Sequence, residues 1–77
     1  MPEKVSVLVL DDDRAHAEAA AESLSRSGYD CTVATSGTEG ARLLEKNSYD
    51  IVLTDLVMRD FSGIEIVRKV RASSPET

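Results

Sequence analysis

Three strand-like segments alternate with three helical patterns along the 77 residues of the chain. In the first and the last of these segments the apolar residues are consecutive, as in Val7-Leu8-Val9 and Ile51-Val52-Leu53. Consecutive rather than alternating apolar residues are typical of strands that are covered on both faces. The pattern predicts strands at about residues 5–10, 29–35 and 50–55, and helices at about residues 14–27, 37–46 and 63–72.

Each predicted helix carries its own boundary signals. Asp13 is placed to cap the first helix and Gly28 to end it. The second and third helices open with capping boxes, Ser36 to Glu39 and Ser62 to Glu65. The order is therefore β-α-β-α-β-α. It predicts a single α/β domain over residues 1–77, with a parallel sheet that has helices on both faces.

Acidic residues follow two of the predicted strands. Asp11, Asp12 and Asp13 come after the first strand, and Asp55 ends the third. Ligands of open parallel sheets bind beyond the carboxyl ends of the strands, so a carboxylate there is a candidate for chemistry. If neighbouring parallel strands bring these acids together, their repulsion favours a bound cation, and oxygen ligands favour Mg²⁺. The alternative for Asp55 is a structural role in a turn or as a helix cap.

Composition limits the partners and the compartment. The net charge of −5 argues against direct binding to nucleic acid or to an anionic membrane. No apolar stretch is long enough to cross a membrane, and the first residues are neither a signal peptide nor a transit peptide, so we expect a cytoplasmic protein. The one cysteine, Cys31, is expected to be a buried thiol in a strand. His16 has no cysteine or second histidine nearby and is expected to face solvent.

Together these features resemble the receiver domain of two-component response regulators, over about residues 5–75. The pair Asp11-Asp12 is similar to the acidic metal-binding pair of that family, and Asp55 is similar to its phosphoacceptor. The helix openings Gly37-Thr38-Glu39 and Gly63-Ile64-Glu65 fit the family as well. It is the combination of acids, spacing and helix openings that is specific.

The resemblance implies a flavodoxin-like fold, with spatial strand order 2-1-3-4-5, and a bound Mg²⁺. The side chains of Asp12 and Asp55 and the backbone carbonyl of Val57 would hold the ion, with Asp11 acting through water. Asp55 would accept a phosphoryl group from a phosphohistidine on a histidine kinase or a phosphotransfer protein. With Asp13 as a third acid, the chain resembles receivers that belong to transcriptional regulators. The implied function is phosphorelay signalling by a module that is not a turnover enzyme.

The chain also departs from the family pattern. Arg59 follows Met58 where the family usually has Pro, and Ser62 stands where it often has Asp. Val57, two residues beyond Asp55, would place an apolar side chain beside the phosphoryl group, so we expect slow to moderate self-dephosphorylation. A complete receiver has two further strands and helices, which carry a Ser or Thr and a Lys. The chain resembles the N-terminal portion alone.

Other functions compete with this one. A sheet of the first three strands leaves residues 50–55 as an apolar edge, which predicts self-association there, most simply as a homodimer. The chain would then be a structural module without phosphotransfer. A phosphatase with an aspartate nucleophile would need a second Asp where Val57 stands. A dinucleotide site would need glycines where the run Asp11 to Asp13 stands.

Overall fold

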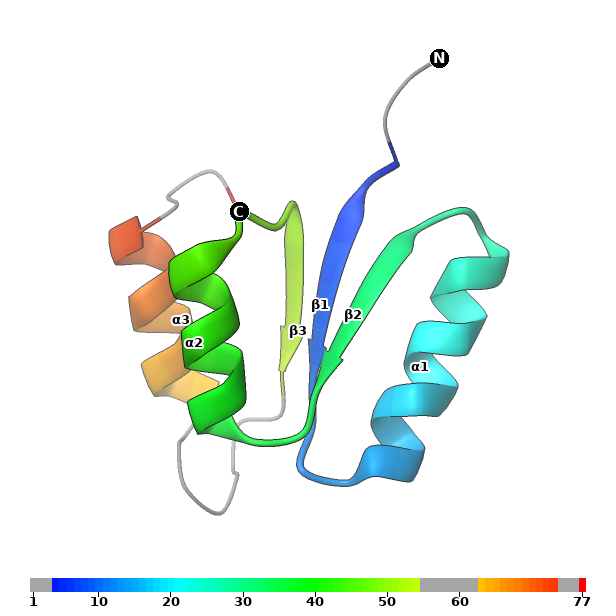
Figure 1. Ribbon diagram of the computed structural model, residues 1–77, viewed down its shortest axis with the longest axis horizontal. Coiled ribbons are helices and arrows are strands. Elements are labelled where there is room, and N and C mark those ends of the chain that lie inside the picture. The colour runs from blue at the N-terminus through cyan, green and yellow to red at the C-terminus, as the bar shows by residue number, and fades with distance from the viewer. Residues whose placement is uncertain (1–3, 55–62, 74–76) are drawn as a thin grey trace.

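The computed structural model describes residues 4–54, 63–73 and 77, which form a three-stranded parallel sheet with helices on both faces (Figure 1). The elements follow the chain in the order β1 (Ser6–Leu10), α1 (Arg14–Arg26), β2 (Asp30–Ala34), α2 (Gly37–Lys46), β3 (Ile51–Thr54) and α3 (Gly63–Ser73). The strands lie in the spatial order β2-β1-β3, so β1 is central. The predicted α/β fold is confirmed, with its β-α-β-α-β-α order and its parallel sheet.

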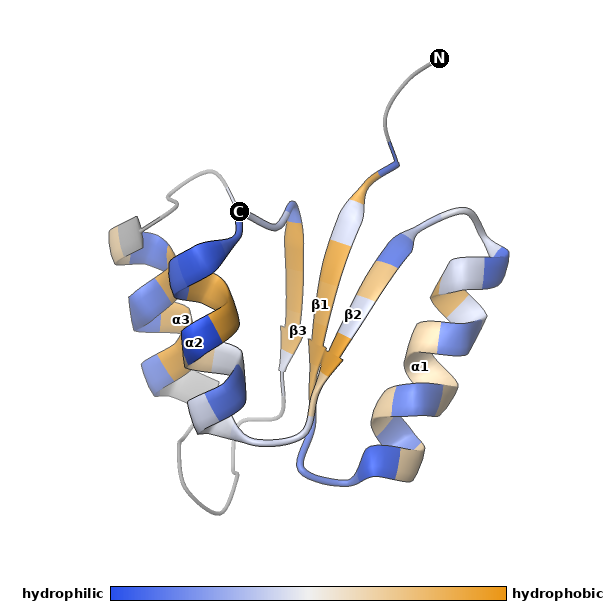
Figure 2. Ribbon diagram, in the orientation of Figure 1, coloured by the Kyte–Doolittle hydropathy of each residue, from blue (hydrophilic) through white to orange (hydrophobic). Residues whose placement is uncertain are grey.

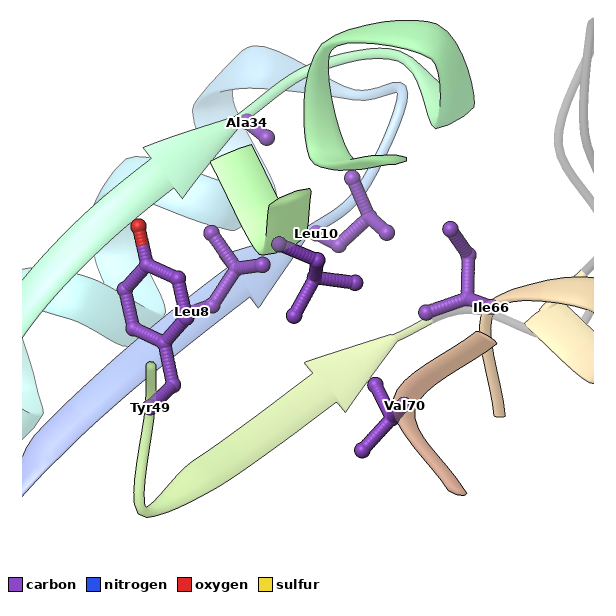
Figure 3. Packing of buried hydrophobic residues seen from close by; sticks show 7 residues of the cluster. Leu8, Leu10, Ala34, Tyr49, Ile66 and Val70 are labelled. Atoms are coloured by element: carbon purple, nitrogen blue, oxygen red, sulfur yellow. The ribbon is translucent and has the colours of Figure 1, made fainter. Parts of the chain in front are cut away.

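Two hydrophobic clusters fill the two faces of the sheet, where the strands carry their apolar residues (Figure 2). The larger cluster lies between the sheet and the pair α2 and α3 (Figure 3). Its buried members are Leu8, Leu10, Ala34, Leu44, Tyr49, Ile66 and Val70. The smaller cluster lies under α1, and its buried members are Val7, Val9 and Ala17. The small side chain of Ala17 is fully buried, which lets α1 lie close to the strands.

The helix boundaries follow the capping signals of the sequence. Asp13 is the N-cap of α1, and its side chain accepts a hydrogen bond of 3.2 Å from a backbone N–H of the first turn, as predicted. Gly28 follows the end of α1 with φ of 97°, a left-handed conformation that suits glycine. Ser36 caps α2 and accepts a hydrogen bond of 3.0 Å from the Glu39 N–H. Ser62, the predicted cap of α3, lies outside the described residues.

Side-chain hydrogen bonds join the amino ends of β1 and β3. Asp50 Oδ2 accepts from the Ser6 backbone N–H at 2.8 Å and from the Ser6 hydroxyl at 3.1 Å. The Asp50 N–H donates to Ser6 Oγ at 3.0 Å. This Ser6–Asp50 bracket connects residues that are 44 positions apart in the sequence. It fixes β3 on β1 at the end of the sheet opposite to the acidic residues.

Two expectations about burial are wrong in part. Ile51 and Leu53 of β3 are 39% and 43% exposed, although their consecutive apolar run predicted a strand covered on both faces. The reason is that β3 is an edge strand of the described sheet. The cluster under α1 contains residues of β1 and β2 but none of β3. Cys31 lies in β2, as predicted, but it is half-buried, because β2 forms the opposite edge. Among the described residues, no helix has the length and apolar character needed to cross a membrane.

Candidate functional site

The carboxyl ends of β1 and β3 lie side by side at one end of the sheet. Leu10, the last residue of β1, is in register with Thr54, the last residue of β3. Paired strands lie about 4.8 Å apart. In the sequence, Asp11 follows Leu10 and Asp55 follows Thr54, so the positions that precede the two predicted acids are direct neighbours. Asp55 and Val57 themselves lie outside the described residues.

Asp11 is oriented by its own backbone and side-chain contacts. Its N–H donates to the carbonyl of Ala34 at 3.1 Å, which adds one hydrogen bond to the β1–β2 ladder. Its Oδ1 accepts from the Asp13 N–H at 2.9 Å, a local turn typical of aspartate. The Asp11 side chain is only 16% exposed. The carboxylate is therefore held at the end of the sheet and largely shielded from solvent.

The three acids of residues 11–13, here called the acid loop, have different environments. The Asp13 carboxylate caps α1 by accepting a hydrogen bond from the His16 N–H, and the Asp13 side chain is 54% exposed. Asp11 and Asp12 are half-buried. This division favours Asp11 and Asp12 over Asp13 as candidates for binding a cation.

His16 lies beside the acid loop, a contact that was not predicted from the sequence. Its Nδ1 is 3.9 Å from a carboxylate oxygen of Asp11 and 3.9 Å from one of Asp13. The side chain is 77% exposed, so the prediction that it faces solvent is confirmed. The sequence did contain a signal for this contact, the spacing of three residues between Asp13 and His16. Residues three apart at the start of a helix are neighbours on its surface. A protonated His16 would form ion pairs with both acids.

The donors of the acid loop suit a hard divalent cation. Mg²⁺ takes oxygen ligands and is usually held by one or two carboxylates together with waters and phosphate oxygens. Within the described part of the chain, no group of three or more His, Cys, Asp or Glu side chains is arranged to hold a metal ion. The expected ligand set is divided between the acid loop and residues 55 and 57. Asp11 and Asp12 are therefore the two members of that set whose surroundings are described.

Comparison with known proteins identifies the family. The model of the response regulator receiver domain matches residues 7–77. The response regulator MprA of Mycobacterium sp. (strain KMS) is 38% identical over 72 residues, which cover 94% of this chain and 31% of the relative. The transcriptional regulatory protein YkoG of Bacillus subtilis (strain 168) is 31% identical over 75 residues, which cover 97% of this chain and 33% of the relative.

A solved structure gives the same result. The response regulator TrrA of Thermotoga maritima, in complex with Mg²⁺-BeF, superposes with a TM-score of 0.86 at 30% identity. The match covers 92% of this chain and 62% of that one. The chain belongs to the receiver-domain family of response regulators in two-component signalling. It spans about a third of the length of the MprA and YkoG regulators.

Proposed function

We propose that the chain accepts a phosphoryl group on Asp55 from a phosphohistidine of a histidine kinase or a phosphotransfer protein. The observation that carries the proposal is the register of Leu10 with Thr54, because the residues that follow them in the sequence are the acids Asp11 and Asp55. The membership of the family supports it. A second support is the TrrA relative, whose structure holds Mg²⁺-BeF.

The residues of the chain have separate tasks in this transfer. An ionised Asp55 supplies the nucleophilic oxygen, which forms a bond to phosphorus while the bond from phosphorus to the donor histidine nitrogen breaks. Asp11 and Asp12, with Asp55 and the Val57 carbonyl, would hold Mg²⁺, and the ion would offset the negative charge of the phosphoryl oxygens. The half-buried position of Asp11 supports this role, because charge is screened less there than in open solvent.

The biological setting is proposed from the relatives. MprA is a response regulator and YkoG is a transcriptional regulatory protein, and the chain matches about a third of each. We infer that the chain serves as receiver for a transcriptional regulator in the cytoplasm. Because Asp55 is itself modified in the transfer, the module acts as a signalling component and not as a turnover enzyme.

The test is phosphorylation by a small acyl phosphate in the presence of MgCl₂, followed by intact mass measurement. The wild-type chain is expected to gain the mass of one phosphoryl group, and Asp55→Asn is expected to gain none. Asp60→Asn, which changes another aspartate of the same segment, is the matched control and should be phosphorylated normally. An unmodified wild-type chain, or an adduct that persists in Asp55→Asn, would contradict the proposal.

Val57 sets an expectation for the lifetime of the phosphorylated form. An apolar side chain at this position cannot orient an attacking water molecule, so hydrolysis of the acyl phosphate is expected to be slow to moderate. Replacement by a polar residue of similar length, Val57→Asn, should shorten the lifetime. Intact mass measured over time gives the lifetime of the phosphorylated wild-type chain. Decay within seconds would contradict this expectation.

A second candidate function is self-association through β3. Ile51 and Leu53 expose 39% and 43% of their surface on this edge strand. A groove of about 320 Å³ runs beside the strand, and Val67 of α3, 43% exposed, contributes to its lining. Exposed apolar edges favour pairing with another strand. We propose that two copies pair their β3 strands antiparallel about a two-fold axis, as a homodimer.

Sedimentation velocity over a range of concentrations tests this second candidate. The wild-type chain should dimerise as its concentration rises, and Leu53→Lys should shift it towards the monomer. Val5→Lys is the matched control, because Val5 is also 40% exposed but lies before β1 and outside the edge strand β3. A folded wild-type monomer at millimolar concentration, or equal effects of both variants, would contradict the homodimer.

A further inference from the structure

Helix α2 lies close to the end of β1 at Gly40. A Cβ atom placed on Gly40 would lie 2.7 Å from Leu10 Cδ1, 2.8 Å from Cδ2 and 3.3 Å from Cγ. Carbon atoms in favourable contact are about 3.5–4.0 Å apart. Even the single methyl group of alanine therefore does not fit at position 40 while Leu10 keeps its place. Glycine is otherwise a poor choice inside a helix, where alanine is preferred.

Leu10 has little room to move away. Its side chain is 1% exposed and belongs to the buried cluster that also contains Ala34 and Ile66 (Figure 3). Its backbone is paired with Ala34 of β2 on one side and with Thr54 of β3 on the other. Both methyl groups and Cγ would meet the new atom, so a small rotation of one methyl does not remove the conflict. The displacement would have to reach the Leu10 backbone or its packed neighbours.

The backbone of Leu10 leads directly into the acid loop. Asp11 follows it, and the Asp11 N–H bonds to the carbonyl of Ala34 at 3.1 Å. The Asp11 carboxylate in turn accepts the Asp13 N–H, so the conformation of the loop is coupled to the place where β1 ends. A shift of Leu10 is thus transmitted to the acids.

We propose that Leu10 and Gly40 are a size-matched pair that positions the acid loop, so that Gly40 is a positioning residue for the cation. The large side chain on β1 requires the absence of a side chain on α2. The role of the pair in cation binding rests on the proposed function. The coupling of the pair to the loop does not, because it concerns the metal-free chain.

The experiment compares four forms of the 77-residue chain: wild type, Gly40→Ala, Leu10→Val and the double variant. Each is measured for Tm, for the amide chemical shifts of residues 11–13 without metal, and for Mg²⁺ affinity. Gly40→Ala is expected to lower the Tm, where helix preference alone would raise it. It is also expected to move the amide signals and to weaken Mg²⁺ binding about tenfold, an effect common for residues that orient metal ligands. The double variant is expected to return the signals and the affinity towards wild type.

Gly28→Ala separates this role from a general loss of stability. Gly28 has φ of 97° and no atom within 4 Å of an added Cβ, so alanine strains the backbone without touching the acid loop. It is expected to lower the Tm while Mg²⁺ affinity and the signals of residues 11–13 stay unchanged. If Gly40→Ala does not fold, Leu10→Val carries the test, because the space that it leaves beside Gly40 should also move these signals.

Each result decides between the two proposals. A higher Tm of Gly40→Ala with unchanged loop signals would overturn the size-matched pair, and so would a double variant that stays as perturbed as Gly40→Ala. If the wild-type chain binds no Mg²⁺, the part of the proposed function that assigns a bound Mg²⁺ to this site is contradicted. The pair is then judged by the metal-free amide signals, which should still move in Gly40→Ala and return in the double variant.

Discussion

The two faces of the sheet are covered to different extents. On one face of the sheet lie α2 and α3 (Figure 1). They enclose large side chains such as Leu8 and Ile66, which are fully buried. On the other face, α1 is the one helix of the described residues, and it covers β1 and β2 through small residues such as Ala17. Val9 of β1 is in register with Leu53 of β3, yet Val9 is 4% exposed and Leu53 is 43% exposed. A long apolar run therefore secures a strand in the sheet, but the cover of that strand depends on how many helices each face receives.

The largest effect is expected on the face with two helices. Ile66→Ala removes a fully buried side chain between α3 and the sheet and should lower the free energy of unfolding by about 3–4 kcal/mol. Urea unfolding followed by circular dichroism measures this loss. Val67→Ala is the control on the same helix, and because Val67 is 43% exposed it should cost about 1 kcal/mol or less. Similar losses in both variants would remove the distinction between covered and uncovered positions.

On the face with one helix, the expected limit is space rather than lost volume. Ala17→Leu inserts a larger side chain where α1 meets the strands and should cost about 1–3 kcal/mol. Ala19→Leu makes the same change at an exposed position of α1 and should change stability by about 0.5 kcal/mol or less. The same urea experiment compares the two. A neutral Ala17→Leu would show that α1 has room to move away from the sheet.

Two neighbours in β3 compare the faces within a single strand. Val52 is packed against the larger cluster, so Val52→Thr places a hydroxyl there and should cost about 1–2 kcal/mol. Ile51 is 39% exposed on the other face, and Ile51→Thr should cost less, about 0.5–1 kcal/mol. Thermal unfolding of the monomer at low concentration ranks the two. The reverse order would mean that the face bearing Ile51 is covered in solution.

The smallest effect concerns the ion pair between α2 and α3. Lys69 Nζ lies 2.9 Å from Glu45 Oε1, and this hydrogen bond and the lysine charge hold the pKa of Glu45 below its usual 4.5. A carboxyl group whose pKa is lower in the folded chain stabilises the fold at any pH above its pKa in the unfolded chain. For Glu45 this stabilisation is lost as the pH falls below about 4.5. Glu45→Gln should therefore make the fall of Tm in acid slightly less steep. Glu22→Gln is the control, because it removes the ion pair with Arg26 inside α1. It should leave the ion pair between Glu45 and Lys69 intact.

The order of elements could be read from the sequence because each signal is local. The apolar run of β1, the cap at Asp13 and the glycine at position 28 all act over a few residues, and the structure confirms the cap and the left-handed glycine. The neighbouring positions of Leu10 and Thr54 followed from the expected strand order, which the sheet also confirms.

Features that depend on distances between elements could not be predicted. The conflict between Leu10 and a side chain at Gly40 depends on how closely α2 lies on β1, and the helical pattern shows only that small residues are present. Likewise, nothing in the sequence pairs Ser6 with Asp50, since their bonds exist only after β3 has joined β1. The exposure of Ile51 escaped the pattern for the same reason, because it reflects where α1 lies.

The Ser6–Asp50 bracket has a consequence for the time at which the proposed cation site forms during folding. The bracket joins positions 44 residues apart, so β1 and β3 meet only after the intervening chain has formed a closed loop, with its entropic cost. While the chain emerges from a ribosome, β1, α1 and β2 are synthesised well before β3. A nascent receiver of that length has Asp11 and Asp12 but not the strand that leads to Asp55. We therefore expect the proposed cation site to form late, together with the docking of β3.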